Sequence, residues 1–497
     1  MENYSIMALL YEINTRVWIF ELREKYGSSI NLGNIPEIEL DEISKNFDWI
    51  WFMGIWDHSK IDEKFIEEHP GLINEVEGAL DDWQIQDIIG SPYSIKNYTI
   101  NSIIGDISDF RNLRERLNKR GVKVMVDFVP NHFGIESRLP LDEPDYFINL
   151  EKTPEFGIIN LFNKVDTEKG VRWIAHGKDP YFSPWDDTYQ VNIFNESLRN
   201  YLIKVLKYIS SISDGVRCDM SMLLNNEVFD ATWGWLNTDE LNTLKDEFWN
   251  IAIREVKNQN PNFVFLAEVY WDLEVDLLSK GFDYAYEKKL YDNLISKNNN
   301  EIFDRIMSTK NHIDKMCRFM ENHDEDRLSS RMTDLENISA MAIIMTMPGL
   351  ILIHQGQIEG NKIRVPVQLK RKSKEIANDK IRFAYENLFM FHKMIKNGVW
   401  IINDIVVSNN DDKVNIFSWS WIYDNRVYVI IINNSDKAVN SAVEFNFKHD
   451  LFDNNSLNYY DHYNFMKSRI SSINNSINWI SKPHEINLLE FNQNVDL

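Results

Sequence analysis

Short apolar runs rich in β-branched and aromatic residues recur along the chain, with helical patterns between them. Runs of this length without polar alternation are typical of strands that are buried on both faces of a parallel sheet. Strands that alternate with helices indicate βα units, and eight such units predict an α/β fold of the (β/α)₈ TIM-barrel class. The predicted strands are residues 9–14, 48–56, 122–129, 215–220, 263–269, 282–286, 315–322 and 349–356.

The helices between these strands have recognisable ends. The segment GDISDFRNLRERLNKRG (105–121) starts with Asp and Ser, has a basic last turn and is followed by Gly, which is favourable capping chemistry. The longest uncharged run, ISAMAIIMTMPGLILIHQG (338–356), is broken at Pro348-Gly349. It therefore predicts a buried helix, a turn and a strand rather than a membrane span.

Two regions depart from the βα pattern. Residues 133–190 are rich in Pro, Asp and aromatic residues without clear periodicity, which predicts a small loop domain inserted after the third strand. Beyond about residue 400, alternating strands at 414–422, 426–434 and 442–447 lack intervening helices and predict a C-terminal antiparallel β-sandwich. The predicted domains are a barrel (1–132 and 191–398), the insert (133–190) and the β domain (399–497).

Composition narrows the class of partner. Apolar residues make up 44% and aromatic residues 13% of the 497-residue chain, which is globular composition. The net charge of -23 argues against nucleic acid or an anionic membrane as partner, so a neutral substrate suits the chain better. The first residues, MENYSIMALLYEINTR, lack a basic segment and carry Glu2 and Glu12, so we expect no signal peptide and a cytoplasmic location. The two cysteines, Cys218 and Cys317, have neither metal-ligand nor disulfide spacing and should lie in the core.

Polar residues gather where the predicted strands end. The strand tails read DFVPNH (127–132), GVRCDMS (215–221), LAEVYW (266–271), ENHDEDR (321–327) and HQGQIEG (354–360). In a barrel, residues at these carboxyl ends assemble the active site. Asp219, Glu268 and Asp324 come from three different units, so they could hold a divalent metal or act as nucleophile and general acid at a glycosidic bond. Aromatic rings near the same loops favour sugars: Trp51, Trp56, Tyr93, Trp185, Tyr270 and Trp271.

Four segments in order, DFVPNH, GVRCDM, LAEVY and FMENHD, resemble the α-amylase family of glycoside hydrolases and transglycosidases, glycoside hydrolase family 13. The segments YEINTRVWI (11–19), IWFMGIW (50–56) and GSPYSIKNYTIN (90–101) are similar to the opening segments of that family. The resemblance covers roughly residues 8 to 365, and the ordered set is far more specific than any one segment.

The resemblance implies a retaining mechanism, in which Asp219 is the nucleophile, Glu268 is the general acid and then base, and Asp324 stabilises the distorted sugar. Arg217 would keep Asp219 ionised, whereas Glu268 would need a raised pKa. The implied substrate-binding residues are Tyr93 as a stacking platform, His132 and His323 as hydrogen-bond donors to hydroxyls, and Arg364 as a further contact.

One departure concerns metal. Calcium-dependent members of the family place a Lys-His pair shortly after the nucleophile, whereas Met222 and Leu223 stand here. We therefore expect no metal and no cofactor, with a structural calcium at Asn131 as the alternative.

Several alternatives stay open. Asp127 could cap a helix or support the active site, and Arg217 with Asp219 could be a structural ion pair. His323-Asp324 could belong to a metal-dependent phosphohydrolase, but further His ligands at matching positions are missing. The favoured function is hydrolysis of α-1,4-linked glucans or maltooligosaccharides. The alternatives are an α-glucan transglycosylase, a disaccharide phosphorylase or a non-catalytic sugar-binding barrel, and the sequence does not determine the acceptor or the oligomeric state.

Overall fold

A closed barrel of eight strands forms the framework of the protein. The computed structural model describes residues 7–236, 246–407, 414–423, 426–453, 456–473 and 475–492. The barrel order is β1-β15-β14-β13-β12-β11-β5-β2, and the predicted TIM barrel is thereby confirmed. Each predicted strand is present: β1 (Met7–Asn14), β2 (Trp49–Met53), β5 (Lys123–Phe128), β11 (Gly215–Cys218), β12 (Val264–Ala267), β13 (Tyr284–Tyr286), β14 (Met316–Phe319) and β15 (Gly349–His354).

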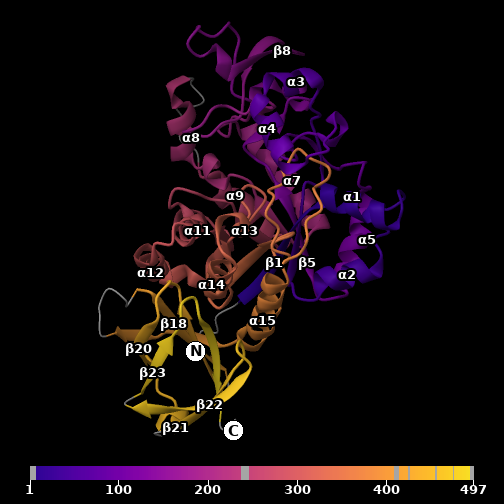
Figure 1. Ribbon diagram of the computed structural model, residues 1–497. Helices are drawn as coiled ribbons and strands as arrows, with labels where there is room; N and C mark the ends of the chain where they lie inside the picture. Colours follow the sequence, from indigo (N-terminus) through magenta and orange to yellow (C-terminus); the bar gives the residue numbers. More distant parts are fainter. Residues whose placement is uncertain are drawn as a thin grey trace. The chain divides into compact units, whose positions relative to one another are not determined.

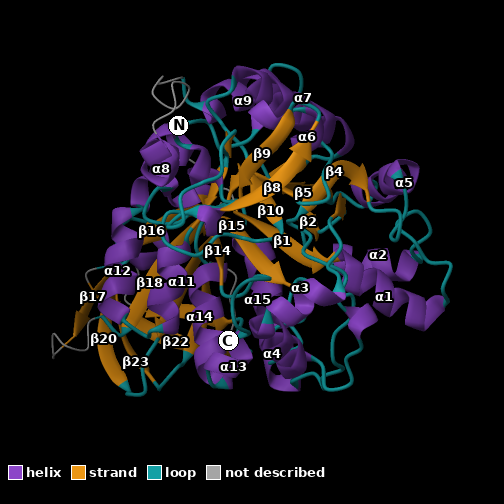
Figure 2. Ribbon diagram, turned by 90° about the horizontal axis from the view of Figure 1, so that it is seen from above, coloured by secondary structure: helices purple, strands orange, loops and turns teal. Residues whose placement is uncertain are grey.

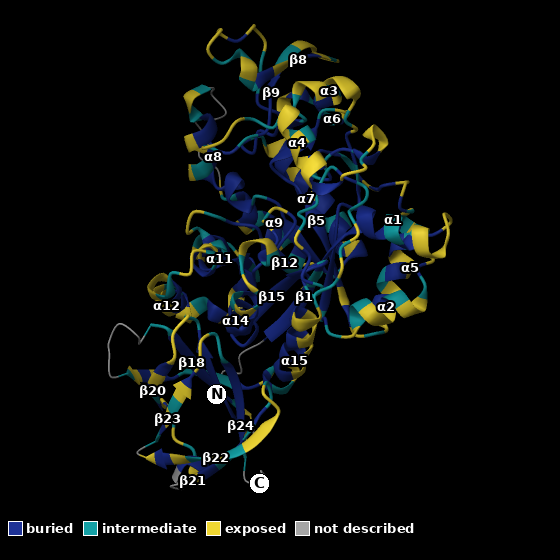
Figure 3. Cartoon of the chain, viewed as in Figure 1, coloured by how far each residue is buried: buried dark blue, intermediate teal, exposed yellow. Residues whose placement is uncertain are grey.

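The barrel strands are buried because helices cover their outer face and side chains fill the inside. Figure 3 shows β5 and β12 in dark blue, whereas exposed positions gather on outer helices such as α1 and α4. The parallel register sets Arg217 of β11 opposite Asp127 of β5 and Leu266 of β12. A charged pair thus lies side by side on two neighbouring strands of the barrel.

Helices follow the strands, as the pattern predicted. Helix α5 starts at its N-cap Asp106, whose side chain accepts from the N–H groups of Ser108 and Asp109, so the predicted capping is confirmed. Figure 2 shows α1, α2 and α5 outside β1, β2 and β5. The helices are α1 (Thr15–Tyr26), α2 (Glu37–Ser44), α3 (Glu63–Glu68), α4 (Pro70–Ala79), α5 (Ile107–Asn118), α6 (Leu139–Asp142), α7 (Glu196–Ile212), α8 (Asn226–Trp233), α9 (Phe248–Lys257), α10 (Glu274–Ser279), α11 (Lys288–Ile295), α12 (Asn299–Ser308), α13 (Leu328–Arg331), α14 (Asp334–Met345) and α15 (Asp379–Ile395).

The stretch after β5 is more ordered than its sequence suggested. It contains a three-stranded sheet, β7-β9-β8, and a two-stranded sheet, β10-β6, and β3 pairs with β4 before it. Strands of two to six residues are too short to give a clear alternating pattern. Their bounds are β3 (Trp56–His58), β4 (Ile95–Ile100), β6 (His132–Gly134), β7 (Asn149–Leu150), β8 (Phe162–Thr167), β9 (Gly170–Ala175) and β10 (Thr188–Gln190).

The C-terminal region is an antiparallel sheet of nine strands in the order β16-β18-β19-β24-β21-β22-β23-β20-β17. The strands predicted at 414–422, 426–434 and 442–447 correspond to β18, β19 and β20. Figure 1 shows these strands in orange and yellow beyond α15. Their bounds are β16 (Val399–Ile402), β17 (Asp404–Val407), β18 (Ile416–Tyr423), β19 (Arg426–Asn433), β20 (Val439–Glu444), β21 (Ser456–Asp461), β22 (Met466–Ile473), β23 (Ser476–Ser481) and β24 (Ile486–Phe491).

By its internal contacts the chain divides into two compact units. The first unit comprises residues 1–9, 287–362 and 375–497, and the second comprises residues 10–286 and 363–374. In the first unit, the indole N–H groups of Trp419 and Trp421 donate to the hydroxyl and the carbonyl of Thr346 at 3.0 and 2.8 Å. The antiparallel sheet is thereby fastened to the end of α14. The predicted domain boundaries stay a prediction.

Two smaller predictions concern the core and the N-terminus. Cys218 and Cys317 are both buried, as predicted. Within the described residues no helix is both long enough and apolar enough to cross a membrane. Of the segment examined for a signal peptide, residues 1–6 lie outside the described residues.

The link between α5 and the barrel can be tested at Asp214. Its carboxylate accepts from Val124 N at 2.8 Å, from Asn118 Nδ2 at 3.0 Å and from Arg114 Nη2 at 2.6 Å. Asp214→Ala should lower the free energy of unfolding by about 3 kcal/mol, because a backbone N–H and a guanidinium lose their acceptor. Urea unfolding measures this loss. Asp304→Ala on exposed α12 should change stability by less than about 0.5 kcal/mol, and equal effects would contradict this account.

Candidate active site

Arg217 is the centre of a buried charge cluster. Its Nη1 lies 2.7 Å from Asp219 Oδ1 and 3.5 Å from Asp127 Oδ1, and its Nη2 lies 2.7 Å from Glu268 Oε1. The Arg217 side chain is 0% exposed. One guanidinium therefore holds carboxylates that come from β5 and from the ends of β11 and β12. The pairing of Arg217 with Asp219 was predicted from the sequence, and the structure brings Glu268 to the same cation.

The parallel strands explain why Asp219 and Glu268 meet. Each residue directly follows its strand and continues the backbone ladder by one position. Asp219 N donates to Phe128 O at 2.8 Å, and Glu268 N donates to Cys218 O at 3.0 Å. Because parallel strands end at the same edge, both side chains lie at the carboxyl end of the barrel. Asp127 lies within β5 and is buried, so of its two proposed roles the helix cap is wrong.

Three aromatic rings surround the Arg217 guanidinium. The ring centres of Trp51, Tyr93 and Tyr286 lie 5.1, 5.3 and 5.9 Å from its Cζ, which is cation–π distance. Burial by itself lowers the pKa of Arg217, but the Glu268 carboxylate and the other negative groups raise that pKa well above its ordinary value. The cation is therefore permanent. No local sequence signal links Tyr286, which lies in the sixth barrel strand, to Arg217.

Glu268 receives two further hydrogen bonds. Met220 N donates to Oε2 at 2.6 Å, and the Tyr270 hydroxyl donates to Oε1 at 2.9 Å. Met220 has a φ of 42°, a left-handed conformation that is costly for a residue with a side chain. These donors stabilise the ionised carboxyl group, whereas burial opposes ionisation. The raised pKa expected for Glu268 stays a prediction, and no sequence signal marked Met220.

His132 contacts the backbone of the predicted stacking residue. Its Nε2 lies 3.2 Å from Tyr93 O, and since a carbonyl can only accept, Nε2 carries the proton and donates. Burial lowers the pKa of His132 to about 4, so the ring is neutral at neutral pH. Nδ1 has no hydrogen-bond partner among the described residues. Nδ1 is buried and carries no proton, so it can only accept a hydrogen bond, and the predicted role of His132 as a donor to a sugar hydroxyl stays a prediction.

The other predicted carboxylate, Asp324, belongs to the other compact unit. It follows β14 and is half exposed, and its Oδ2 lies 3.1 Å from Nε2 of the buried His323. The side chain of Asn322 accepts from the N–H groups of Asp324 and Glu325 at 2.9 Å, which fixes the turn after the strand. Both predicted residues therefore stand on a defined turn at the carboxyl end of a barrel strand.

Arg364 pairs with a carboxylate outside the cluster. Its Nη2 lies 2.9 Å from Glu75 Oε2 on α4, and its side chain is 31% exposed. Its predicted contact with a sugar hydroxyl stays a prediction.

Asn131, the alternative calcium ligand, is paired with an amide. Gln190 Nε2 donates to both the backbone O and the side-chain Oδ1 of Asn131 at 3.0 Å. An amide N–H therefore occupies one lone pair of each Asn131 oxygen that could bind a cation, and the expected absence of a metal stays a prediction.

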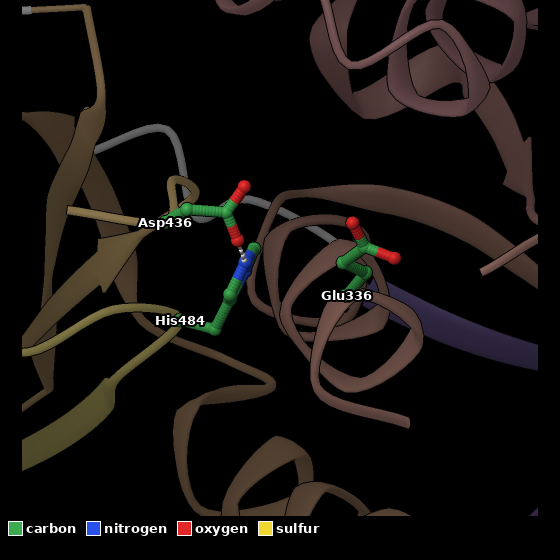
Figure 4. A group of neighbouring side chains, drawn as sticks. All are labelled: Glu336, Asp436 and His484. Carbon is green, nitrogen blue, oxygen red and sulfur yellow. Dashed lines mark hydrogen bonds and ion pairs between the residues drawn. The ribbon is translucent and has the colours of Figure 1, made fainter. Parts of the chain in front are cut away.

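A second group of possible metal ligands lies in the first unit, where Glu336, Asp436 and His484 have ligand atoms within 4.8 Å of one another (Figure 4). The His484 Nε2 is 2.9 Å from Asp436 Oδ1. Glu336 accepts from Thr333 N at 2.8 Å through one oxygen and from the Lys297 ammonium through the other. A metal would have to displace that ammonium. Glu336 forms the capping box of α14 with Thr333, and His484 contacts Asp436 separately.

The strand ends of a closed parallel barrel bring two carboxylates onto one buried arginine, which is surrounded by aromatic rings. This combination defines the class of barrel glycosidases. The family description "Alpha amylase, catalytic domain" matches residues 47–386. The chain belongs to the α-amylase family of glycoside hydrolases, and the resemblance seen in the sequence is confirmed.

The chain is similar to several members of the family. It is 24% identical over 291 residues to alpha-amylase 3 of Dictyoglomus thermophilum, covering 53% of each chain. It is 24% identical over 280 residues to a cyclomaltodextrin glucanotransferase of Geobacillus stearothermophilus, covering 52% of this chain and 36% of that enzyme. The chain thus spans about half or less of the length of these relatives. The structure of a noncanonic maltogenic alpha-amylase from Thermotoga neapolitana has a TM-score of 0.69 at 18% identity, covering 98% of both chains, which supports the fold.

Neutral, buried His132 predicts a dependence of stability on pH. The pKa of His132 is about 4 in the folded chain and about 6.5 in the unfolded chain. Between about pH 4 and pH 6.5, therefore, the unfolded chain binds a proton at this residue and the folded chain does not. This contribution to stability is complete above pH 6.5 and falls as the pH drops, by about 2 kcal/mol at pH 5. Urea unfolding at pH 7 and pH 5 should show a smaller loss in His132→Gln than in the wild type. His312→Gln should keep the wild-type loss, and an unchanged loss in His132→Gln would refute the argument.

Proposed function

We propose that the protein is a retaining α-glucoside hydrolase that acts on α-1,4-linked glucans or maltooligosaccharides. The observation that carries the proposal is the pairing of Asp219 and Glu268 with one guanidinium, at 2.7 Å each. The names of the similar proteins, an alpha-amylase and a cyclomaltodextrin glucanotransferase, support an α-glucan substrate. A cytoplasmic location remains part of the prediction.

In the proposed mechanism, Asp219 attacks the anomeric carbon while Glu268 gives its proton to the leaving oxygen, so that a covalent glycosyl-enzyme forms as the glycosidic bond breaks. Water then loses a proton to Glu268 and attacks the same carbon, which releases Asp219. Arg217 keeps Asp219 ionised for the first step. Asp324 is assigned to the sugar hydroxyls on the strength of the family resemblance and of its place after β14.

Two exposed aromatic residues in contact, one of them close to Glu268 in the sequence, support a substrate of several sugar units. Trp271 lies three positions after Glu268 and contacts Tyr181 edge to face, with ring centres 5.0 Å apart. Trp271 is 37% and Tyr181 is 70% exposed, which is unusual for rings of this size. Such flat, exposed rings are suited to the apolar C–H faces of pyranose units. Asp179 fixes the backbone at Tyr181, because its Oδ1 accepts from Tyr181 N at 2.6 Å.

The function is tested on maltotriose, maltoheptaose, sucrose and trehalose, with and without phosphate. We expect wild-type enzyme to release sugar from the maltooligosaccharides without phosphate, and Asp219→Asn to lower kcat/KM by about 10³-fold or more, because the amide cannot act as nucleophile. NMR should show the α-anomer of the product first. Release of the β-anomer first would make the retaining mechanism wrong.

The control is Asp166→Asn on β8, an exposed carboxylate that should leave kcat/KM as in the wild type. Turnover that requires phosphate would indicate a phosphorylase, and transfer to a second sugar would indicate a transglycosylase. Sugar binding without turnover of any α-glucoside would favour the non-catalytic barrel.

The Asn131–Gln190 pair supports a protein that needs no calcium at this position. Excess EDTA should therefore leave the Tm and the maltooligosaccharide activity unchanged, since removing a ligand that binds only the folded state would lower stability. Thermal unfolding with EDTA, and again after added calcium, checks this. A Tm that falls with EDTA and is restored by calcium but not by magnesium would contradict the proposal.

A further inference from the structure

Arg16 is a buried cation whose described partners are all neutral. It lies in the first turn of α1, directly after β1, and is 4% exposed. Among the described residues no carboxylate forms an ion pair with it, although buried charges are costly unless paired. Burial lowers the pKa of Arg16 to about 9, so it keeps its charge at neutral pH. The cost of burying this charge needs a compensating role.

The Arg16 guanidinium joins segments that are far apart in the sequence. Its Nη1 donates to Gly90 O at 2.8 Å and lies 3.0 Å from His58 Nε2, and its Nη2 donates to Val367 O. These partners lie 42, 74 and 351 positions away from Arg16. Hydrogen bonds from a charged donor to carbonyl oxygens are among the stronger ones in proteins.

His58 serves as an acceptor in this arrangement. Its Nδ1 lies 3.0 Å from Ser59 O, which can only accept, so Nδ1 carries the proton and Nε2 is free to accept from Arg16. Burial lowers the pKa of His58 to about 4, with the charge of Arg16 acting in the same direction. The imidazole is therefore neutral beside the guanidinium.

The first segment held by Arg16 is the turn of residues 90–94, here called the platform turn, which carries Tyr93. Gly90 has a φ of 95°, and a Cβ there would lie 2.3 Å from Ser59 O, so glycine alone fits. Ser94 N donates to Ser91 O at 3.2 Å, and Ser59 N donates to Ser94 O at 2.8 Å. The turn is thus tightly packed on one side, and Arg16 holds the carbonyl at its start.

The second segment is residues 363–374, here called the strap, which follows β15. The strap pairs with the residues just before the platform turn, because Ile89 N donates to Gln368 O at 2.8 Å and Lys370 N donates to Asp87 O at 2.9 Å. Arg16 reaches the same stretch of strap at Val367. One side chain therefore fixes both the strap and the platform turn to the start of α1.

We propose that Arg16 is a positioning residue. By holding Gly90 and Val367 together, it sets the position of the Tyr93 ring relative to the Arg217 guanidinium. The ring centre of Tyr93 lies 5.3 Å from the Arg217 guanidinium, which also binds Asp219 and Glu268. A shift of the platform turn would move the surface on which the sugar ring rests relative to the nucleophile. The inference rests on the proposed function of Tyr93 as the stacking platform.

The test compares Arg16→Gln with Arg23→Gln. Arg23 is a matched control, because it lies on the same helix and also donates to two carbonyls, Ile30 O at 2.8 Å and Ile103 O at 2.6 Å. We expect Arg16→Gln to lower kcat/KM on maltoheptaose by about 10- to 100-fold, since a misplacement of about 1 Å has effects of this size. Arg23→Gln should stay within about twofold of the wild type, and equal losses in both variants would overturn the proposal.

Coupling to Tyr93 separates positioning from general destabilisation. If Arg16 acts through the Tyr93 ring, Arg16→Gln should lower kcat/KM by less than about threefold further in a Tyr93→Ala background. Full additivity of the two losses would overturn the proposal. Arg16→Lys keeps the charge and some of the donors, and should recover part of the activity. If neither Arg16 variant folds, as judged by thermal unfolding, Arg16 serves the fold alone and the positioning role is rejected.

Hydrogen exchange tests the same contacts without relying on turnover. Arg16→Gln should speed exchange at the amides of Ile89 and Lys370, which pair the strap with the residues before the platform turn, whereas Arg23→Gln should not. Unchanged exchange overturns the inference even if the enzyme is active. If the wild type turns over no α-glucoside, the proposed function fails by itself, and the exchange result still decides whether Arg16 holds the two segments.

Discussion

The structure depends most on the burial of the Arg217 charge. A guanidinium without solvent is strongly unfavourable unless carboxylates compensate it, and here they come from three neighbouring strands. Those strands must keep their register, since a shift by one residue would turn Arg217 away from Asp127. One cation cannot neutralise three carboxylates that lie so close together, so the cluster has an excess of negative charge.

The sequence predicted the elements and residues whose signals are local. Apolar runs gave the eight barrel strands, and Asp219, Glu268 and Arg217 could be named because each lies within two residues of a strand end. The contacts that shape the site could not be found this way, because they join distant strands. Trp51 and Tyr286 meet Arg217 only in the closed barrel, and the left-handed backbone of Met220 has no residue preference to reveal it. The small sheet β7-β9-β8 was missed because its strands are short.

Two buried arginines have complementary roles in the second compact unit. Arg217 is paired with carboxylates at the proposed catalytic site, whereas Arg16 is paired with carbonyls and a neutral imidazole. Tyr93 connects them, because its ring contacts Arg217 and its turn is held by Arg16. Because its described carbonyl partners add no negative charge, Arg16 keeps an uncompensated positive charge at the start of α1.

The same balance of charge bears on the acceptor of the glycosyl group. A phosphate ion approaching Asp219 and Glu268 would meet carboxylates whose one cation is already paired. Basic residues of the strap are engaged as well, since Arg364 pairs with Glu75 and Arg371 pairs with Asp87. Phosphate would have to break such pairs to be bound, whereas water or a sugar hydroxyl brings no charge that needs a free cation. In the proposed function, this pairing of the cations is the reason to expect a neutral acceptor rather than phosphate.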